Sequence, residues 1–101
     1  MTENNGALSG LKIVACSTAQ AGTVPYMLMA DLGAEVIKIE TPGKGDMNRK
    51  SGYLMGSTGS FFETNNRGVK SLTLNLKSEK GQKILHELIK DADIFGQNFR
   101  P

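Results

Sequence analysis

Strand-like and helix-like segments alternate along the 101 residues, and this alternation restricts the fold more than any other property of the sequence. The run LKIVAC is short, apolar and rich in β-branched residues, which is typical of a buried strand. Strands are predicted at residues 11–16, 35–40, 71–76 and 93–97. Because helix-like segments separate strands, the strands should be parallel and joined by crossovers. We predict an α/β fold with a Rossmann-like parallel sheet in the order β-α-β-loop-β-α-β, with residues 1–101 forming part of a larger domain.

Two helices are expected between the strands. The first, at 25–32, begins with Pro25, which suits a first helical turn, and Gly33 suits the position just past its end. This segment is apolar nearly all round, so we expect the helix to be mostly buried. The second helix is predicted at 79–91, with Ser78 as its N-cap and one apolar face at helical spacing.

Residues 41–70 interrupt the alternating pattern. They contain six glycines, Pro42 and several polar residues, and no clear strand or helix period. We interpret them as a long loop, and a loop of this length inside a compact domain usually either has a functional purpose or is poorly ordered.

The composition excludes several classes of protein. Lys and Arg total 12 and Asp and Glu total 10, so the net charge of +2 does not favour nucleic-acid binding. Cys16 is the only cysteine, so no disulfide forms within the chain, which fits a reducing compartment. His86 has no second ligand at a metal-binding spacing. With no secretion signal and no apolar run long enough to span a bilayer, we expect a cytoplasmic protein that binds neither metal nor membrane.

The predicted binding site lies at the carboxyl ends of the strands, where open parallel sheets bind their ligands. The segments 17–23, 41–70 and 97–101 follow predicted strands and carry small or polar residues. We interpret seven basic residues as gathering near this edge: Lys44, Arg49, Lys50, Arg67, Lys70, Lys77 and Arg100. Such side chains suit a phosphate-bearing ligand, although an ordinary connection and a solvated surface explain the same pattern. Neither a dinucleotide fingerprint nor a Walker A loop is present, and no catalytic residue is evident.

Five ordered sequence blocks carry a resemblance to a known family: LSGLKIV, AQAG, MADLGAEVIKIETPGKGD, NNRGVKSLTLNLKSEKG and DADIFGQNFRP. From about Leu8 to Pro101 the chain resembles the family III CoA-transferases, which include formyl-CoA transferase, the carnitine CoA-transferase and a related acyl-CoA racemase. The chain departs from the family pattern at Thr41, where some relatives carry an arginine near the adenine of CoA.

The resemblance implies a set of CoA contacts. The loop after the first strand would lie along the CoA, the end of the third strand would border the adenine and phosphate end, and the run after the fourth strand would contact the pantetheine and pyrophosphate. The residues implied are Ala19, Gln20, Ala21, Leu74, Lys77, Asn98, Phe99 and Arg100, with Arg67 and Lys70 as additional phosphate contacts.

The resemblance also implies an activity, the transfer of coenzyme A between an acyl-CoA and a free carboxylic acid. CoA would then be a substrate, no cofactor would be tightly bound, and the protein would be an interlocked homodimer. The family's nucleophilic aspartate lies downstream of Pro101, so we expect these 101 residues alone to be inactive. Two alternatives stay open: an acyl-CoA racemase of the same superfamily, and a nucleotide-binding module without catalysis.

Overall fold

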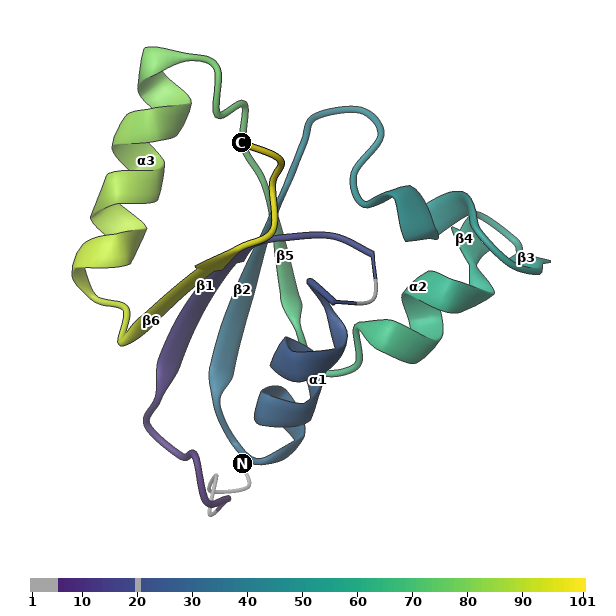
Figure 1. Cartoon of the computed structure of the whole chain (residues 1–101), viewed down its shortest axis with the longest axis horizontal. Coiled ribbons are helices and arrows are strands. Elements are labelled where there is room, and N and C mark those ends of the chain that lie inside the picture. Colours follow the sequence, from purple (N-terminus) through teal and green to yellow (C-terminus); the bar gives the residue numbers. More distant parts are fainter. Residues whose placement is uncertain (1–5, 20) are drawn as a thin grey trace.

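A four-stranded parallel sheet forms the centre of the molecule (Figure 1). The computed structural model describes residues 6–19 and 21–101. The sheet has the spatial order β5-β2-β1-β6. Its strands, in chain order, are β1 (Lys12–Cys16), β2 (Glu35–Glu40), β5 (Lys70–Thr73) and β6 (Ile94–Gln97). All three neighbouring pairs are parallel, which confirms the predicted α/β fold.

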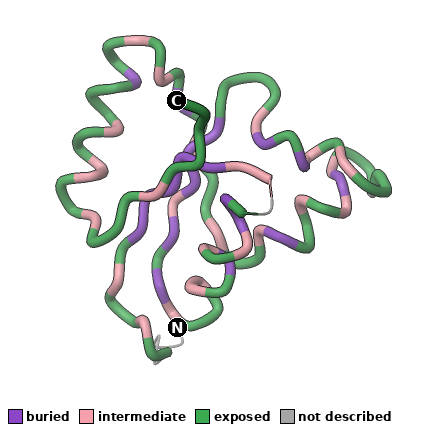
Figure 2. Tube along the Cα trace, in the orientation of Figure 1, coloured by how far each residue is buried: buried purple, intermediate pink, exposed green. Residues whose placement is uncertain are grey.

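Two helices cover opposite faces of this sheet (Figure 1). Helix α3 (Glu79–Lys90) packs on one face, where Leu85 and Leu88 contact the buried cluster that includes Val14 and Ile39. Helix α1 (Val24–Asp31) packs on the other face, against the cluster of Ile13, Ala34 and Val36. Four consecutive residues of β1, 13–16, are buried (purple in Figure 2). Since side chains alternate between the two faces of a strand, β1 is covered on both faces.

The helix ends follow the sequence signals. Pro25 lies in the first turn of α1, and Gly33 after its end has φ 108°, a conformation that favours glycine. The hydroxyl of Ser78 accepts a hydrogen bond of 3.0 Å from the N–H of Gly81, so Ser78 is the N-cap of α3 as predicted. Within the described ranges, no helix has the length and apolar character needed to cross a membrane.

The expectation that the first helix is mostly buried was wrong. Only Met27 of α1 is buried, while Leu28 is 51% and Leu32 50% exposed. The helix is apolar nearly all round, but the sheet covers only one of its sides. The apolar outer side of α1 is therefore open to solvent in this chain.

The segment predicted as a loop is partly regular. It contains a 3₁₀ helix, η1 (Met47–Lys50), a small antiparallel pair of strands, β3 (Leu54–Met55) and β4 (Thr58–Gly59), and helix α2 (Ser60–Asn65). These elements form a group beside the sheet (Figure 1). They are too short to give a recognisable period in the sequence, and the glycines between them conceal their boundaries.

Candidate functional site

The carboxyl ends of the four parallel strands meet at one edge of the sheet, as predicted. The chain leaves β1 into residues 17–23, β2 into 41–45, β5 into 74–78 and β6 into 98–101. Ligands of open α/β sheets bind in this position. We call this the carboxyl edge.

A pair of hydrogen bonds joins the segments that follow β1 and β6. The side-chain oxygen of Asn98 accepts a 3.0 Å hydrogen bond from the N–H of Thr18. Its amide nitrogen donates to the carbonyl of Thr18 at 2.9 Å. The side-chain oxygen and nitrogen of Asn98 thus both bind the backbone of Thr18, and we call this arrangement the Asn98–Thr18 clasp. It fixes the start of the first loop relative to the last described segment.

The loop after β1 has an unusual backbone. Ala19 has φ 62°, in a left-handed region that a residue with a Cβ rarely adopts, and its carbonyl accepts a hydrogen bond from the hydroxyl of Thr23. The buried hydroxyl of Ser17 has no hydrogen-bond partner among the described residues, which is rare for a buried polar group. Ala21 is exposed, and Gln20 lies outside the described residues.

The other predicted contacts at this edge are mostly accessible. Phe99 and Arg100 are exposed, and the N–H of Phe99 donates to the side chain of Gln97 at 2.7 Å. Leu74 is buried where β5 ends, and its N–H donates to the carbonyl of Glu40 at 3.0 Å. Lys77 is exposed just beyond it. The carboxyl edge therefore brings together the predicted residues that follow β1, β5 and β6.

Arg67 and Lys70 lie elsewhere, so the expectation that they join a basic cluster at the carboxyl edge was wrong. Both precede the body of a parallel strand, which directs them toward the opposite, amino-terminal edge. Arg67 makes a two-pronged ion pair with Asp31 at 3.0 and 2.5 Å, and Lys70 pairs with Glu35 at 3.2 Å. The Arg67 guanidinium lowers the pKa of the Asp31 carboxyl. Their position and their pairing argue against a phosphate contact by either residue.

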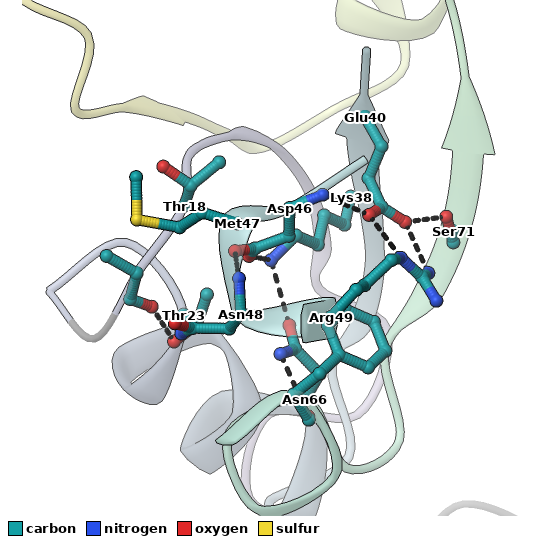
Figure 3. A network of polar contacts seen from close by, with 12 residues as sticks. Thr18, Thr23, Lys38, Glu40, Asp46, Met47, Asn48, Arg49, Asn66 and Ser71 are labelled. Carbon is teal, nitrogen blue, oxygen red and sulfur yellow. Dashed lines mark hydrogen bonds and ion pairs between the residues drawn. The ribbon is translucent and has the colours of Figure 1, made fainter. Parts of the chain in front are cut away.

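A buried polar network supports the segment after β2 (Figure 3). Glu40 is 4% exposed, and Arg49 donates to both of its carboxylate oxygens, at 2.8 and 2.7 Å. The hydroxyl of Ser71 and the N–H of Asp46 also donate to this carboxylate. Burial by itself would raise the pKa of the Glu40 carboxyl, but these hydrogen bonds outweigh it and lower the pKa to about 2. Glu40 is therefore a fixed anion with a structural role.

A second buried ion pair continues this network. The ammonium group of Lys38, a residue only 3% exposed, pairs with Asp46 and donates to the side-chain oxygen of Asn66 at 2.9 Å. The Asp46 carboxylate also accepts from the N–H of Asn48 at 2.9 Å, which caps η1. The Phe62 ring lies 3.8 Å from the guanidinium carbon of Arg49, in cation–π contact. Together these contacts fix β2, η1 and α2 relative to one another.

Sequence reasoning missed this network. Lys38 and Glu40 lie on the same face of β2 as the buried Val36, because residues two apart share a face. Their partners lie six to thirty-one positions further along the chain. The one available signal was the phase of the alternation, which puts both charged residues on the face of Val36.

The arrangement at the carboxyl edge is suited to binding. The exposed cations and the loops can hold an elongated anion, and the charged groups of the buried network are neutralised in pairs. Within the ranges 6–19 and 21–101, no group of three or more His, Cys, Asp or Glu side chains is placed to hold a metal ion. The pKa of the buried Cys16 thiol is raised by its burial, which disfavours a thiolate nucleophile.

The fold and the carboxyl edge place this chain in the class of α/β domains whose ligand-binding loops follow the carboxyl ends of a parallel sheet. Residues 8–101 match CoA-transferase family III, and the chain belongs to this family. The predicted family resemblance is thereby confirmed.

Individual relatives support the assignment. The chain is 41% identical over 95 residues to the succinyl-CoA:glutarate CoA-transferase of Homo sapiens, and the alignment covers 93% of this chain and 22% of the enzyme. It is 38% identical over 96 residues to the acetyl-CoA:oxalate CoA-transferase of Acetobacter aceti, covering 95% and 25%. A crystal structure of a CAIB/BAIF family protein from Brucella suis superposes with a TM-score of 0.87 at 34% identity, covering 94% of this chain and 26% of that one. The chain thus spans about a quarter of the length of these relatives.

Proposed function

We propose that this chain is the amino-terminal, CoA-binding part of a CoA-transferase that moves coenzyme A between an acyl-CoA and a free carboxylic acid. The family membership supports this proposal, and both relatives compared by sequence are named as CoA-transferases. These names favour transfer over racemisation and over a binding module without catalysis. The interlocked homodimer and the cytoplasmic location stay predictions.

The observation that carries the proposal is the Asn98–Thr18 clasp. It holds the segments after two neighbouring strands in one surface at the carboxyl edge, with Phe99 and Arg100 exposed immediately beyond it. We propose that the pantetheine arm and the pyrophosphate of CoA lie along this surface.

The other end of the ligand would lie over β5. Strand β5 is three places from β6 in the sheet, and neighbouring strands are about 4.8 Å apart, so the two ends of the edge are roughly 14 Å apart. An elongated molecule such as CoA can span this width. Leu74 would then border the adenine, and the exposed ammonium of Lys77 would attract phosphate.

The chemistry would take place on a carboxylate outside these residues. In the proposed reaction an aspartate attacks the acyl-CoA carbonyl, and the CoA thiolate leaves to give a mixed anhydride. The thiolate then attacks the aspartyl carbonyl, forming an aspartyl-CoA thioester and releasing the first acid. The acceptor acid repeats these steps in reverse. This chain would contribute the binding and orientation of CoA, which is a substrate and leaves with the product.

An assay of the full-length protein that contains this chain tests the proposal. The purified protein is incubated with succinyl-CoA or acetyl-CoA and a series of carboxylic acids, and the CoA esters are separated by chromatography. We expect a new acyl-CoA to appear as the first one disappears, and the 101-residue chain alone to give none. Turnover by the 101-residue chain, or only hydrolysis to free CoA by the full-length protein, would overturn the proposal.

A further inference from the structure

Three contacts hold the described residues of the loop after β1. At the start of the loop, the Asn98–Thr18 clasp fixes the backbone of Thr18. Gly22 lies against the same residue, since an added Cβ on Gly22 would lie 2.4 Å from the Thr18 carbonyl oxygen. At the end of the loop, the hydroxyl of Thr23 donates to the carbonyl of Ala19 (Figure 3). The first two contacts fix where the loop lies, and the third acts on the conformation of Ala19.

Ala19 has a backbone conformation that alanine disfavours. Its φ of 62° lies in the left-handed region, where the Cβ crowds a carbonyl oxygen. Such a conformation persists only where surrounding contacts enforce it. The hydrogen bond from Thr23 is a contact of this kind. Because Thr23 is only 2% exposed, water competes little with this bond, which therefore holds the Ala19 carbonyl in the direction that the left-handed conformation gives it.

We propose that Thr23 is a positioning residue for CoA, because it holds Ala19 in the left-handed conformation and so keeps the loop after β1 in its binding shape before CoA arrives. The proposal rests on the function proposed above, in which the segments after β1 and β6 bind the pantetheine arm. Thr23 is buried, so it acts through Ala19 and does not touch the ligand. A loop that is already ordered loses less entropy on binding.

This role has a kinetic signature. Without the Thr23 hydroxyl, Ala19 spends much of its time in ordinary backbone conformations, and only the fraction of molecules with the left-handed conformation binds CoA. The apparent dissociation constant rises by the reciprocal of that fraction. The association rate constant falls by the same factor, while the dissociation rate constant is unchanged, because the contacts with bound CoA are the same. A lost direct contact with the ligand would instead raise the dissociation rate constant.

Surface plasmon resonance of CoA over the immobilised full-length protein measures both rate constants and tests the proposal. Thr23→Val keeps the shape of the side chain and removes the hydroxyl. It should lower the association rate constant about fivefold, the effect of losing one neutral hydrogen bond, and leave the dissociation rate constant nearly unchanged. Thr23→Ser keeps the hydroxyl and should associate at nearly the unmodified rate.

A second substitution tests the link to Ala19. Adding Ala19→Gly to Thr23→Val should recover part of the lost association rate, since glycine adopts a positive φ without the penalty of a Cβ. The control is Thr64→Val on α2, which removes an exposed hydroxyl that donates to the Phe61 carbonyl at 3.4 Å. This variant should change neither rate constant.

The outcomes separate the two proposals. If the unmodified protein binds CoA and Thr23→Val associates at the same rate, or loses affinity only through faster dissociation, the positioning role is wrong and the proposed function stands. Failure of Ala19→Gly to recover any of the lost rate would also overturn the positioning role. If the unmodified protein does not bind CoA, the proposed function is wrong and the positioning role with it. Circular dichroism checks the fold of each variant, and Thr23→Ala carries the same test if valine prevents folding.

Discussion

The side-chain amide of Asn98 donates to the carbonyl of Thr18 at 2.9 Å and accepts from its N–H at 3.0 Å. A substitution that removes these bonds frees the segments after β1 and β6 from each other. We predict that Asn98→Ala weakens CoA binding about tenfold, while the thermal midpoint changes little because the bonds are exposed. Calorimetry and thermal denaturation of the same full-length variants measure the two effects.

Asn98→Asp is the matched variant for this prediction. The carboxylate can still accept from the Thr18 N–H, but its second oxygen would face the Thr18 carbonyl, and two acceptors repel. This variant should therefore bind CoA no better than Asn98→Ala. Binding at the level of the unmodified protein would show that the clasp does not shape the site.

Removing Arg49 should destabilise the chain. In Arg49→Ala the buried Glu40 loses its counter-charge and one donor to each oxygen, keeping only the donors from Ser71 and Asp46. Leaving one partner of a buried ion pair alone typically costs 3–5 kcal/mol. We expect about 3 kcal/mol, because the Arg49 side chain is 34% exposed and water can partly replace it. Urea denaturation measures the loss. Arg49→Lys should recover only part of it, since an ammonium group cannot form the two-pronged contact.

The neighbouring Lys50 provides the control. It is exposed and makes no ion pair with the described residues, so Lys50→Ala should be close to neutral. Equal losses in Arg49→Ala and Lys50→Ala would contradict the assigned role of the Glu40–Arg49 pair.

Acid should weaken the fold through the same carboxylate. The pKa of Glu40 is lowered from 4.5 to about 2 in the folded chain. The contribution of this carboxylate to the free energy of unfolding is therefore fully present above about pH 4.5. It is lost as the pH falls from about 4.5 to about 2, and it amounts to about 3 kcal/mol. The free energy of unfolding, measured by urea denaturation across this range, should fall more steeply for the unmodified chain than for Arg49→Ala. Parallel curves would refute this prediction.

The four strands could be predicted because their pattern is local. The run LKIVAC carries apolar residues on both faces, which a strand in the middle of a parallel sheet needs. The third strand was predicted at 71–76 but spans Lys70–Thr73, because its last contact with β2 is the pairing of Thr73 with Glu40, where β2 itself ends. That contact links residues far apart in the sequence, so no local pattern reveals it.

The candidate site was only partly predictable for the same reason. Lys77, Asn98 and Arg100 follow parallel strands, so the topology alone places them at the carboxyl edge. Arg67 comes before a strand, so the topology also places it, at the amino-terminal edge. The sequence analysis grouped it with the other basic residues by charge alone and therefore placed it at the wrong edge. The partners of Lys38 and Glu40 depend on how η1 and α2 pack, which the glycine-rich segment does not show.

The two edges of the sheet give opposite predictions for basic residues. Lys77→Ala and Arg100→Ala should each weaken CoA binding about tenfold or more through a lost phosphate contact. Arg67→Ala should leave the affinity within twofold, because Arg67 pairs with Asp31 at the amino-terminal edge. Titrations of the three full-length variants compare them directly. A larger loss in Arg67→Ala than in Lys77→Ala would reverse our assignment of the edges.

A crystal structure of the full-length protein with CoA bound is the most direct test of the central claim. The account predicts that CoA lies across the carboxyl edge, with its pantetheine along the Asn98–Thr18 clasp and its adenosine end beside Leu74 and Lys77. Electron density for CoA at the amino-terminal edge beside Arg67, or on a surface that these 101 residues do not form, would contradict it.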